Sequence, residues 1–176
     1  GDVGSGKTVV AATAMLNVAL SRNQSVLLCP TEILARQHFQ SISKLLKPFD
    51  IECFLLIGST PKVEKEETYS KIRDGEARVI IGTHALLEKN IEFWRLGLAI
   101  VDEQHRFGVD QRAALRKESL STKTLPHFLT MTATPIPITL SLTIFGDLDV
   151  SVLNELPPGR KKIITRLVPN EKKQNG

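Results

Sequence analysis

The first eight residues constrain the fold more than any other stretch of the chain. They read Gly-Asp-Val-Gly-Ser-Gly-Lys-Thr, which fits the pattern G-x-x-x-x-G-K-[ST] of a phosphate-binding loop. Glycines at these positions let the backbone turn tightly and bring its N–H groups against phosphate oxygens. A helix that begins at about Gly6 would also direct its positive end at the anion. The alternative is a glycine turn in front of an ordinary helix.

The two residues that end this loop have separate expected roles. We expect Lys7 to reach the β- and γ-phosphates of a nucleotide as a point charge, and Thr8 to offer its hydroxyl to Mg²⁺. The predicted phosphate-binding residues are Gly1, Asp2, Val3, Gly4, Ser5, Gly6, Lys7 and Thr8. Such a loop normally follows a buried strand, so we expect a further strand ahead of Gly1.

Length and composition indicate an ordinary globular domain. The chain has 176 residues, of which 41% are hydrophobic and 24% charged, and this length predicts about one domain. No apolar run is long enough to span a membrane and no signal peptide opens the chain. We therefore expect a cytoplasmic location and no membrane partner. Cys29 and Cys53 both lie in apolar runs, which predicts two buried thiols rather than a disulfide.

Positive charge is concentrated near the C-terminus. Up to Pro158 there are 17 basic residues against 18 acidic ones, whereas from Gly159 onward six basic residues stand against one acidic residue. The net charge of +4 therefore comes from the tail. A basic tail can contact nucleic acid; the alternative is a solvated strand and linker.

Apolar segments of strand length alternate with segments of helical pattern. Strands are expected at 25–29, 51–57, 78–82, 97–101 and 127–131, and helices at about 9–20, 32–46, 61–74 and 109–120. The first helix is apolar nearly all round, which predicts burial on all sides. Thr31 is a candidate N-cap, Pro61 suits a first helical position and Gly75 a helix end. The alternation predicts an α/β fold with a mostly parallel sheet covered by helices on both faces.

Two carboxylates follow the fourth expected strand. Asp102 can hold Mg²⁺, directly or through water, and Glu103 can orient and deprotonate the water that attacks a γ-phosphate. In a parallel sheet, ligands bind outside the carboxyl ends of the strands, where this pair falls. His105 comes directly after them and can sense the γ-phosphate; the alternative is a polar residue flanking a helix.

Threonines follow three of the expected strands. Thr132 and Thr134 can bond Asp102 or His105 and so report the nucleotide state, or they can simply cap the segment beside Pro135. Thr31 and Thr83 each stand where a strand passes into a helix. Helix-start N–H groups with neighbouring side chains suit the phosphates of a nucleic acid, which makes candidate contacts of Thr31, Arg36, Gln37, Thr83 and His84. Plain N-capping is the alternative.

Taken in order, these segments resemble the motifs of superfamily 2 helicases. The order is the phosphate loop, P-T-x-x-L-A-x-Q at 30–37, G-T-H-A-L-L at 82–87, D-E-Q-H-R-F-G-V at 102–109 and T-A-T-P-I-P at 132–137. With L-P-P-G-R at 156–160, the longer motifs are similar to those of the RecG family of bacterial ATP-dependent DNA helicases. The transcription-repair coupling translocases share most motifs, but are expected to read D-E-E-Q-R-F-G where this chain has Gln104 and His105.

The resemblance implies a RecA-like ATP-binding domain over 1–155, followed at 156–176 by a linker and the start of a second motor domain. It also implies ATP and Mg²⁺ as cofactors and branched DNA as partner, with roles in recombination and repair. The second motor domain, with its arginine fingers, and a junction-binding wedge domain are expected in cis in a monomer. The isolated chain is therefore expected to show little ATPase and no unwinding.

One residue departs from the family pattern, and two other functions stay open. After T-A-T-P the family is expected to read I-P-R-T, whereas this chain has Ile138 at the arginine position. The chain can instead be the motor module of a transcription-repair coupling translocase. It can also be a nucleotide-dependent interaction module without enzymatic activity.

Overall fold

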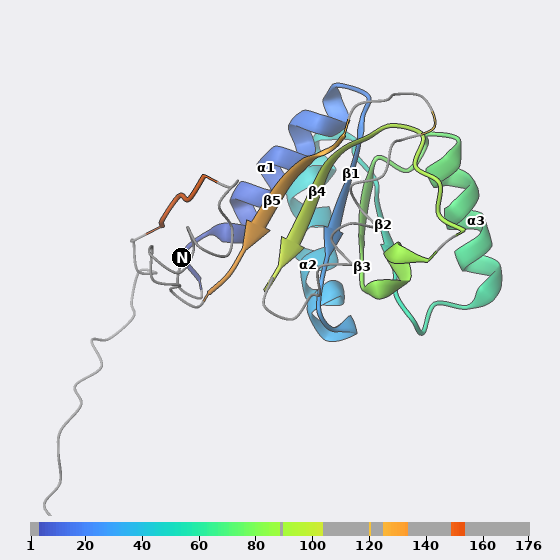
Figure 1. Ribbon diagram of the computed structural model, residues 1–176, viewed down its shortest axis with the longest axis horizontal. Coiled ribbons are helices and arrows are strands. Elements are labelled where there is room, and N and C mark those ends of the chain that lie inside the picture. The colour runs from blue at the N-terminus through green and yellow to red at the C-terminus, as the bar shows by residue number, and fades with distance from the viewer. Residues whose placement is uncertain (1–3, 89, 104–119, 121–124, 134–148, 154–176) are drawn as a thin grey trace, which may run out of the picture.

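A single parallel sheet organises the molecule. The computed structural model describes residues 4–88, 90–103, 120, 125–133 and 149–153. Within them five strands pair in the order β2-β3-β1-β4-β5, and every neighbouring pair is parallel (Figure 1). The strands are β1 (Gln24–Leu28), β2 (Cys53–Leu56), β3 (Val79–Gly82), β4 (Leu96–Asp102) and β5 (His127–Met131). The predicted sheet is confirmed, and the expected strand ends agree to within two residues.

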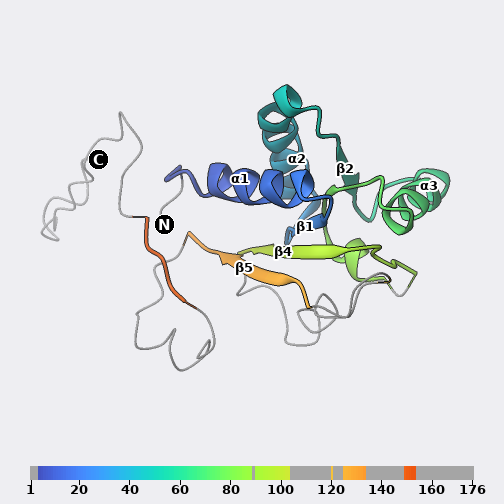
Figure 2. The ribbon, with the colours of Figure 1, turned by 90° about the horizontal axis from the view of Figure 1, so that it is seen from above.

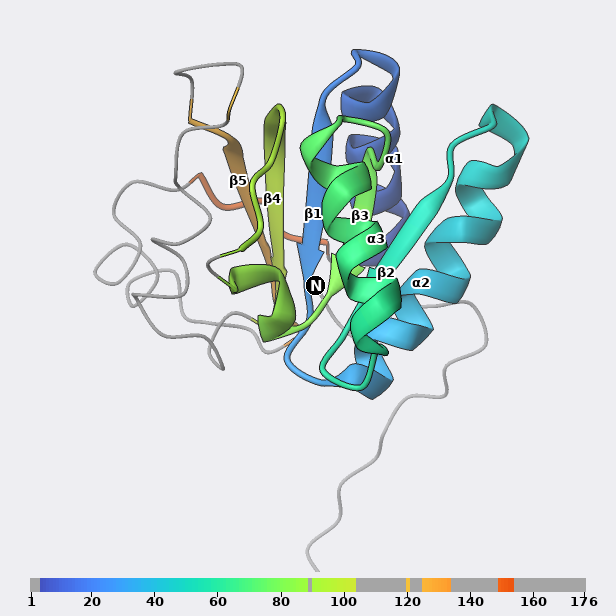
Figure 3. The ribbon, with the colours of Figure 1, turned by 90° about the vertical axis from the view of Figure 1, so that its right-hand side faces the viewer.

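Helices cover both faces of this sheet, as predicted. The long helices α1 (Lys7–Leu20) and α2 (Glu32–Leu46) lie on one face, and α1 lies over β1 and β4 (Figure 2). Helix α3 (Lys62–Arg73) and the short 3₁₀ helix η2 (His84–Leu87) lie on the other face (Figure 3). A second 3₁₀ helix, η1 (Lys47–Phe49), follows α2. No helix in the described part of the chain is long and apolar enough to cross a membrane.

The strand at the centre of the sheet shows why both faces need cover. All five residues of β1 are buried. Leu27 belongs to the apolar cluster under α1 and α2, whereas Val26 and Leu28 belong to the cluster on the α3 side. Successive side chains of a strand point to opposite faces, so a continuous apolar run can be buried only between two layers.

Three local expectations need correction. Helix α1 buries one side, with Ala11, Ala12, Met15 and Ala19 in the core, while Val9, Val10 and Leu20 are about half exposed. Its predicted burial on all sides was therefore wrong, because only the stripe that faces the sheet and α2 is covered. Pro61 caps α3 instead of starting it, and the helix expected after Thr83 is a single 3₁₀ turn. Gly75 follows the end of α3 with φ 77°, as expected of a helix terminator.

A buried amide ties the beginning of the central strand to its surroundings. The Nε2 of Gln24 donates to the carbonyls of Ile72 and Ala77, both at 2.8 Å, and its Oε1 accepts from the N–H of Arg95 at 2.9 Å. Gln24 is 1% exposed. Since all three partners are backbone groups, this side chain joins β1 to the end of α3 and to the segment that leads into β4.

Both cysteines are free and buried, as predicted. Burial raises the pKa of the Cys29 thiol, and the nearby charge of Asp102 raises it further. Burial also raises the pKa of Cys53. Thiols in this state are protonated and unreactive near neutral pH.

We expect Gly82→Ala to destabilise the fold by roughly 1–3 kcal/mol, the usual cost of an overpacked core. A Cβ at Gly82 would lie 2.0 Å from the carbonyl oxygen of Leu56. That carbonyl accepts the N–H of Thr83 at 3.2 Å, so it cannot move without loss of a bond between β2 and β3. Denaturant unfolding of the full-length protein measures the change.

Gly58→Ala is the matched control for this substitution. A Cβ at Gly58 would meet only the Oε1 of Glu32, at 2.9 Å. The end of a glutamate side chain can shift, whereas a strand carbonyl cannot, so the control should lose less stability. Equal losses in the two variants would contradict the close-approach explanation.

Candidate functional site

The predicted site residues gather at one end of the sheet. Asp102 and Met131 end β4 and β5 as partners in the parallel register. Helix α1 begins at the end of the sheet to which the arrows of β4 and β5 point (Figure 1). The described part of the phosphate loop and the two carboxylates therefore lie at the carboxyl ends of the strands, where parallel sheets bind ligands.

The loop has the backbone conformation that its glycines predict. Gly4 and Gly6 have φ angles of 81° and 94°, in the left-handed region that glycine adopts without strain. Gly6 is the N-cap of α1, and its carbonyl accepts the N–H of Val9 at 2.9 Å. Among the described residues no side chain caps this helix, its first turn holds no acidic residue, and a Cβ on Gly6 would meet no atom within 4 Å. In this part of the chain nothing occupies the positive end of α1, where an anion can bind.

A buried hydroxyl in the loop also fits a phosphate. The Oγ of Ser5 is buried and, among the described residues, has no hydrogen-bond partner. Buried polar groups are usually paired, and this hydroxyl lies in the loop where it can pair with a phosphate oxygen. Residues 1–3 lie outside the described part of the chain, and the predictions for Gly1, Asp2 and Val3 stay predictions.

The candidate ligands at this site suit Mg²⁺ better than a metal ion that is coordinated by protein side chains alone. The described residues contain no group of three or more His, Cys, Asp or Glu side chains that could hold a metal ion. Mg²⁺ is usually held by one or two carboxylates together with substrate phosphates and water. The Asp102 carboxylate and the Thr8 hydroxyl are hard oxygen ligands of this kind, so the residues present fit the ion.

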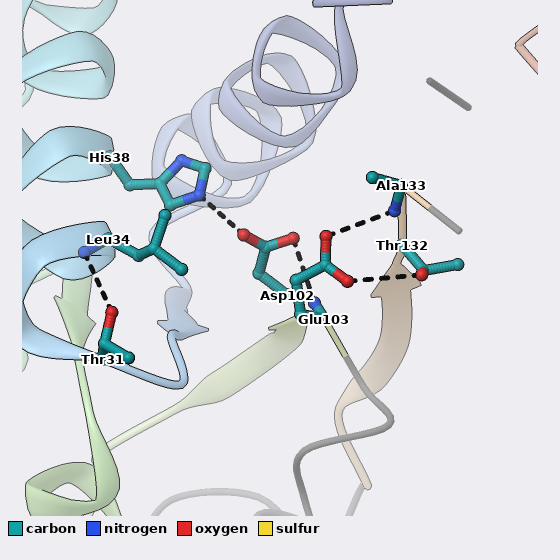
Figure 4. A network of polar contacts seen from close by, with 7 residues as sticks. All are labelled: Thr31, Leu34, His38, Asp102, Glu103, Thr132 and Ala133. Carbon is teal, nitrogen blue, oxygen red and sulfur yellow. Dashed lines mark hydrogen bonds and ion pairs between the residues drawn. The ribbon is translucent and has the colours of Figure 1, made fainter. Parts of the chain in front are cut away.

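Asp102 is held from two sides. It is 7% exposed. Its Oδ2 lies 2.8 Å from the Nε2 of His38, and its Oδ1 accepts the N–H of Glu103 at 3.1 Å (Figure 4). His38 comes from α2 and Glu103 directly follows β4, so the carboxylate is oriented by two different elements.

Glu103 leaves the strand in a backbone conformation that is uncommon for its residue type. Its φ is 50°, in the left-handed region. Its N–H donates to the carbonyl of Met131 at 2.9 Å. Its Oε1 accepts the N–H of Ala133 at 3.3 Å, and its Oε2 accepts the hydroxyl of Thr132 at 3.4 Å (Figure 4). The segment after β5 thus holds both carboxylate oxygens.

The structure shows a partner of Thr132 that the sequence did not suggest. Its hydroxyl donates to the Glu103 carboxylate, and the expected bonds to Asp102 or His105 stay predictions. In the parallel register Asp102 lies beside Met131, which brings the residues after each strand together. His105 and Thr134 lie outside the described residues.

The candidate nucleic-acid contacts differ in accessibility. Arg36 and Gln37 are exposed on α2, and Arg36 also donates to the Ser59 hydroxyl at 3.4 Å. Thr31 caps α2, because its Oγ1 accepts the N–H of Leu34 at 3.3 Å. His84 is exposed, but Thr83 is 2% exposed and its hydroxyl is buried without a hydrogen-bond partner in the described part of the chain. Thr31 therefore caps α2 with its side chain, whereas the Thr83 side chain does not cap η2.

Ser59 organises the turn beside these residues. Glu32 accepts its N–H at 2.9 Å and its hydroxyl at 2.6 Å. These bonds lower the pKa of Glu32. The turn after β2 is thus attached to the first turn of α2, next to Arg36.

Sequence reasoning assigned no role to His38. The signal was its position on the buried side of α2, three residues after Ala35 and four before Ile42, both of which are fully buried. A histidine in the apolar stripe of a helix needs a polar partner. Nothing in the sequence alone identified Asp102 as that partner.

Comparisons with known proteins agree with this arrangement. The DEAD/DEAH box helicase family model matches residues 1–142. ATP-dependent DNA helicase RecG of Aquifex aeolicus is 48% identical over 174 residues, covering 99% of this chain and 22% of the relative. RecG of Streptococcus pneumoniae is 52% identical over 171 residues, covering 97% and 25% respectively. The chain thus spans about a quarter of the length of these curated relatives.

Solved structures show the same fold. A structure of RecG bound to a three-way DNA junction superposes with a TM-score of 0.77 at 44% identity, covering 93% of this chain and 21% of that one. The L327V variant of S. cerevisiae Dbp5 bound to RNA and ADP BeF3 superposes with a TM-score of 0.61 at 20% identity, which shows the fold alone; it covers 86% of this chain and 40% of that one. The chain therefore belongs to the DEAD/DEAH box helicase family, and its matched relatives include RecG.

Proposed function

We propose that this chain is the ATP-binding motor domain of a RecG-like DNA helicase. The whole protein would couple ATP hydrolysis to the remodelling or branch migration of stalled forks and Holliday junctions. The observation that carries the proposal is that α1 begins at the same end of the sheet at which Asp102 and Glu103 lie. The names of the RecG relatives and the junction-bound RecG structure support it.

The proposed ATP site combines the loop with the carboxylates. The loop and Lys7 bind the β- and γ-phosphates, and Thr8 with Asp102 would hold Mg²⁺. When bound, the ion supplies positive charge that offsets the charge developing on the transferred phosphoryl group. Glu103 accepts a proton from the attacking water, and the contacts from Thr132 and Ala133 keep its carboxylate in one orientation.

The proposed DNA contacts lie at the start of α2 and after β3. Arg36 and Gln37 offer exposed side chains to the DNA backbone, and His84 does so from η2. At Thr31 and Thr83, the proposed contacts to the DNA backbone come from the N–H groups of the turns that these residues begin. Contacts of this kind position a motor without reading sequence, as a helicase that acts on many sequences requires.

The remaining assignments concern the whole protein. Residues 1–155 form the first motor domain, and 156–176 lead into a second RecA-like domain that supplies arginine fingers. A wedge domain recognises the branched DNA, and the protein works as a monomer. Three residues would couple the nucleotide state of the ATP site to movement of the motor domains: Thr132, Thr134 and His105.

ATP hydrolysis by the full-length protein tests this proposal. We expect turnover to be stimulated by DNA, more by a three-way junction than by linear duplex of equal length, and the junction to be unwound only with ATP. ATP binding without DNA-stimulated turnover would instead identify a nucleotide-dependent interaction module. Displacement of RNA polymerase without junction unwinding would identify a transcription-repair coupling translocase.

A further inference from the structure

The contact between His38 and Asp102 joins two parts of the proposed machinery that lie far apart in sequence. We propose that His38 is a positioning residue, which orients the Asp102 carboxylate for the metal of the ATP site and links that site to the helix bearing the DNA contacts. The inference rests on the proposed function, because it takes Asp102 as the metal-holding carboxylate.

The chemistry of the partner assigns His38 the role of donor. The Nε2 of His38 lies 2.8 Å from Oδ2 of Asp102, within charge-assisted hydrogen-bond distance. An ionised carboxylate only accepts hydrogen bonds, so the proton lies on Nε2. The two side chains are 14% and 10% exposed, so little water competes for the bond.

The contact orients Asp102 and leaves lone pairs available on both of its carboxylate oxygens. His38 engages Oδ2, and the N–H of Glu103 engages Oδ1 at 3.1 Å. Each carboxylate oxygen has two lone pairs, so each can still bind a metal ion or a metal-bound water. Loss of the imidazole would leave the carboxylate held from its own strand end alone.

Helix α2 places this donor and the proposed DNA contacts on one rigid body. Arg36 and His38 are two positions apart, which in an α-helix turns their side chains about 200° from each other. Arg36 is exposed and reaches Ser59, whereas His38 is partly buried and reaches Asp102. A shift of α2 caused by DNA at Arg36 must therefore also move the Nε2 of His38 relative to Asp102.

Partners that orient a metal ligand typically change metal affinity or activity by about 10–100-fold when they are removed. In the full-length protein, we therefore compare His38→Phe, which keeps a ring but has no donor, with His38→Gln, whose amide nitrogen can reach a similar position. The probe is a fluorescent, non-hydrolysable ATP analogue, whose binding is titrated with Mg²⁺. Gln40→Ala, an exposed position on the same helix, is the control.

We expect His38→Phe to raise the half-saturating Mg²⁺ concentration by about 10–100-fold and His38→Gln to keep it near the wild-type value. The ratio of DNA-stimulated to basal ATPase should fall in His38→Phe alone. A thermal unfolding midpoint confirms that each variant folds, and His38→Ala repeats the test if the phenylalanine variant does not.

Asp102→Asn separates the two ways in which this idea can fail. If Asp102→Asn shifts the Mg²⁺ requirement and His38→Phe does not, the positioning role is wrong while the proposed function stands. If neither substitution shifts it, Asp102 does not hold the metal and the proposed ATP site is wrong. A shifted Mg²⁺ requirement with an unchanged DNA-stimulation ratio would overturn the link to the DNA contacts of α2.

Discussion

Glu103→Gln should lower the kcat of ATP hydrolysis by about 10²–10⁴-fold, the usual contribution of a general base, while ATP binding is retained. An amide cannot accept the proton of the attacking water at neutral pH. The phosphate-binding loop and Asp102 are unaltered, so the KM for ATP should stay within a few-fold of the wild-type value.

Glutamine can keep two of the contacts that Glu103 makes with the segment after β5. The Oε1 of Glu103 accepts from the N–H of Ala133 and its Oε2 from the hydroxyl of Thr132. A glutamine can keep both contacts, because its oxygen can face Ala133 while its amide nitrogen donates to the threonine oxygen. These two contacts to the segment after β5 can therefore be kept, while the basic group is lost.

Two measurements test this prediction. Steady-state ATPase with and without DNA gives kcat and KM, and titration with a fluorescent ATP analogue gives the affinity for the nucleotide. Glu67→Gln is the control, since Glu67 is an exposed carboxylate on α3 that pairs only with Lys71 among the described contacts. If kcat in Glu103→Gln falls less than tenfold, another group activates the water.

Lys7→Ala should lower kcat by about 10²–10³-fold, which is typical of losing one preorganised group that stabilises transition-state charge. Unwinding of a DNA junction should be abolished. Lys7 is the first residue of α1 and directly follows the glycine that caps it. Its ammonium group therefore adds a full positive charge where the helix end offers a partial one.

ATP binding distinguishes this variant from Glu103→Gln, because Lys7→Ala should weaken affinity for the nucleotide as well as turnover. Lys44→Ala, an exposed lysine in the last turn of α2, controls for the loss of one positive charge. Lys7→Arg should not restore activity, because a guanidinium is larger and planar. Persistent junction unwinding by Lys7→Ala would show that the motor assignment is wrong.

Much of the fold could be predicted because the signals were local. Apolar runs of strand length alternated with helical segments, and a buried parallel sheet needs that pattern. The limits of α2 were predicted at 32–46 and observed at the same residues, because Thr31 caps its start. Burial was harder to predict, since Val9, Val10 and Leu20 are as apolar as the residues of α1 that pack in the core.

The site was predicted less completely than the fold. The loop glycines, Lys7, Thr8 and the two carboxylates carry chemistry in their residue types and spacing, so sequence alone made them candidates. Gln24 and His38 carry no such signal. Their roles depend on backbone and side-chain partners that are separated from them by 48 to 71 residues.

By itself, the sequence determined the order of elements and the residue types at the carboxyl ends of the strands. Only the tertiary structure decided which of those residues touch. The parallel register brings Asp102 beside Met131, so Glu103 is held by Thr132 and Ala133. The packing of α2 brings His38 to Asp102. The physical reason is that hydrogen bonds form over about 3 Å, and folding alone brings atoms from distant segments within that distance.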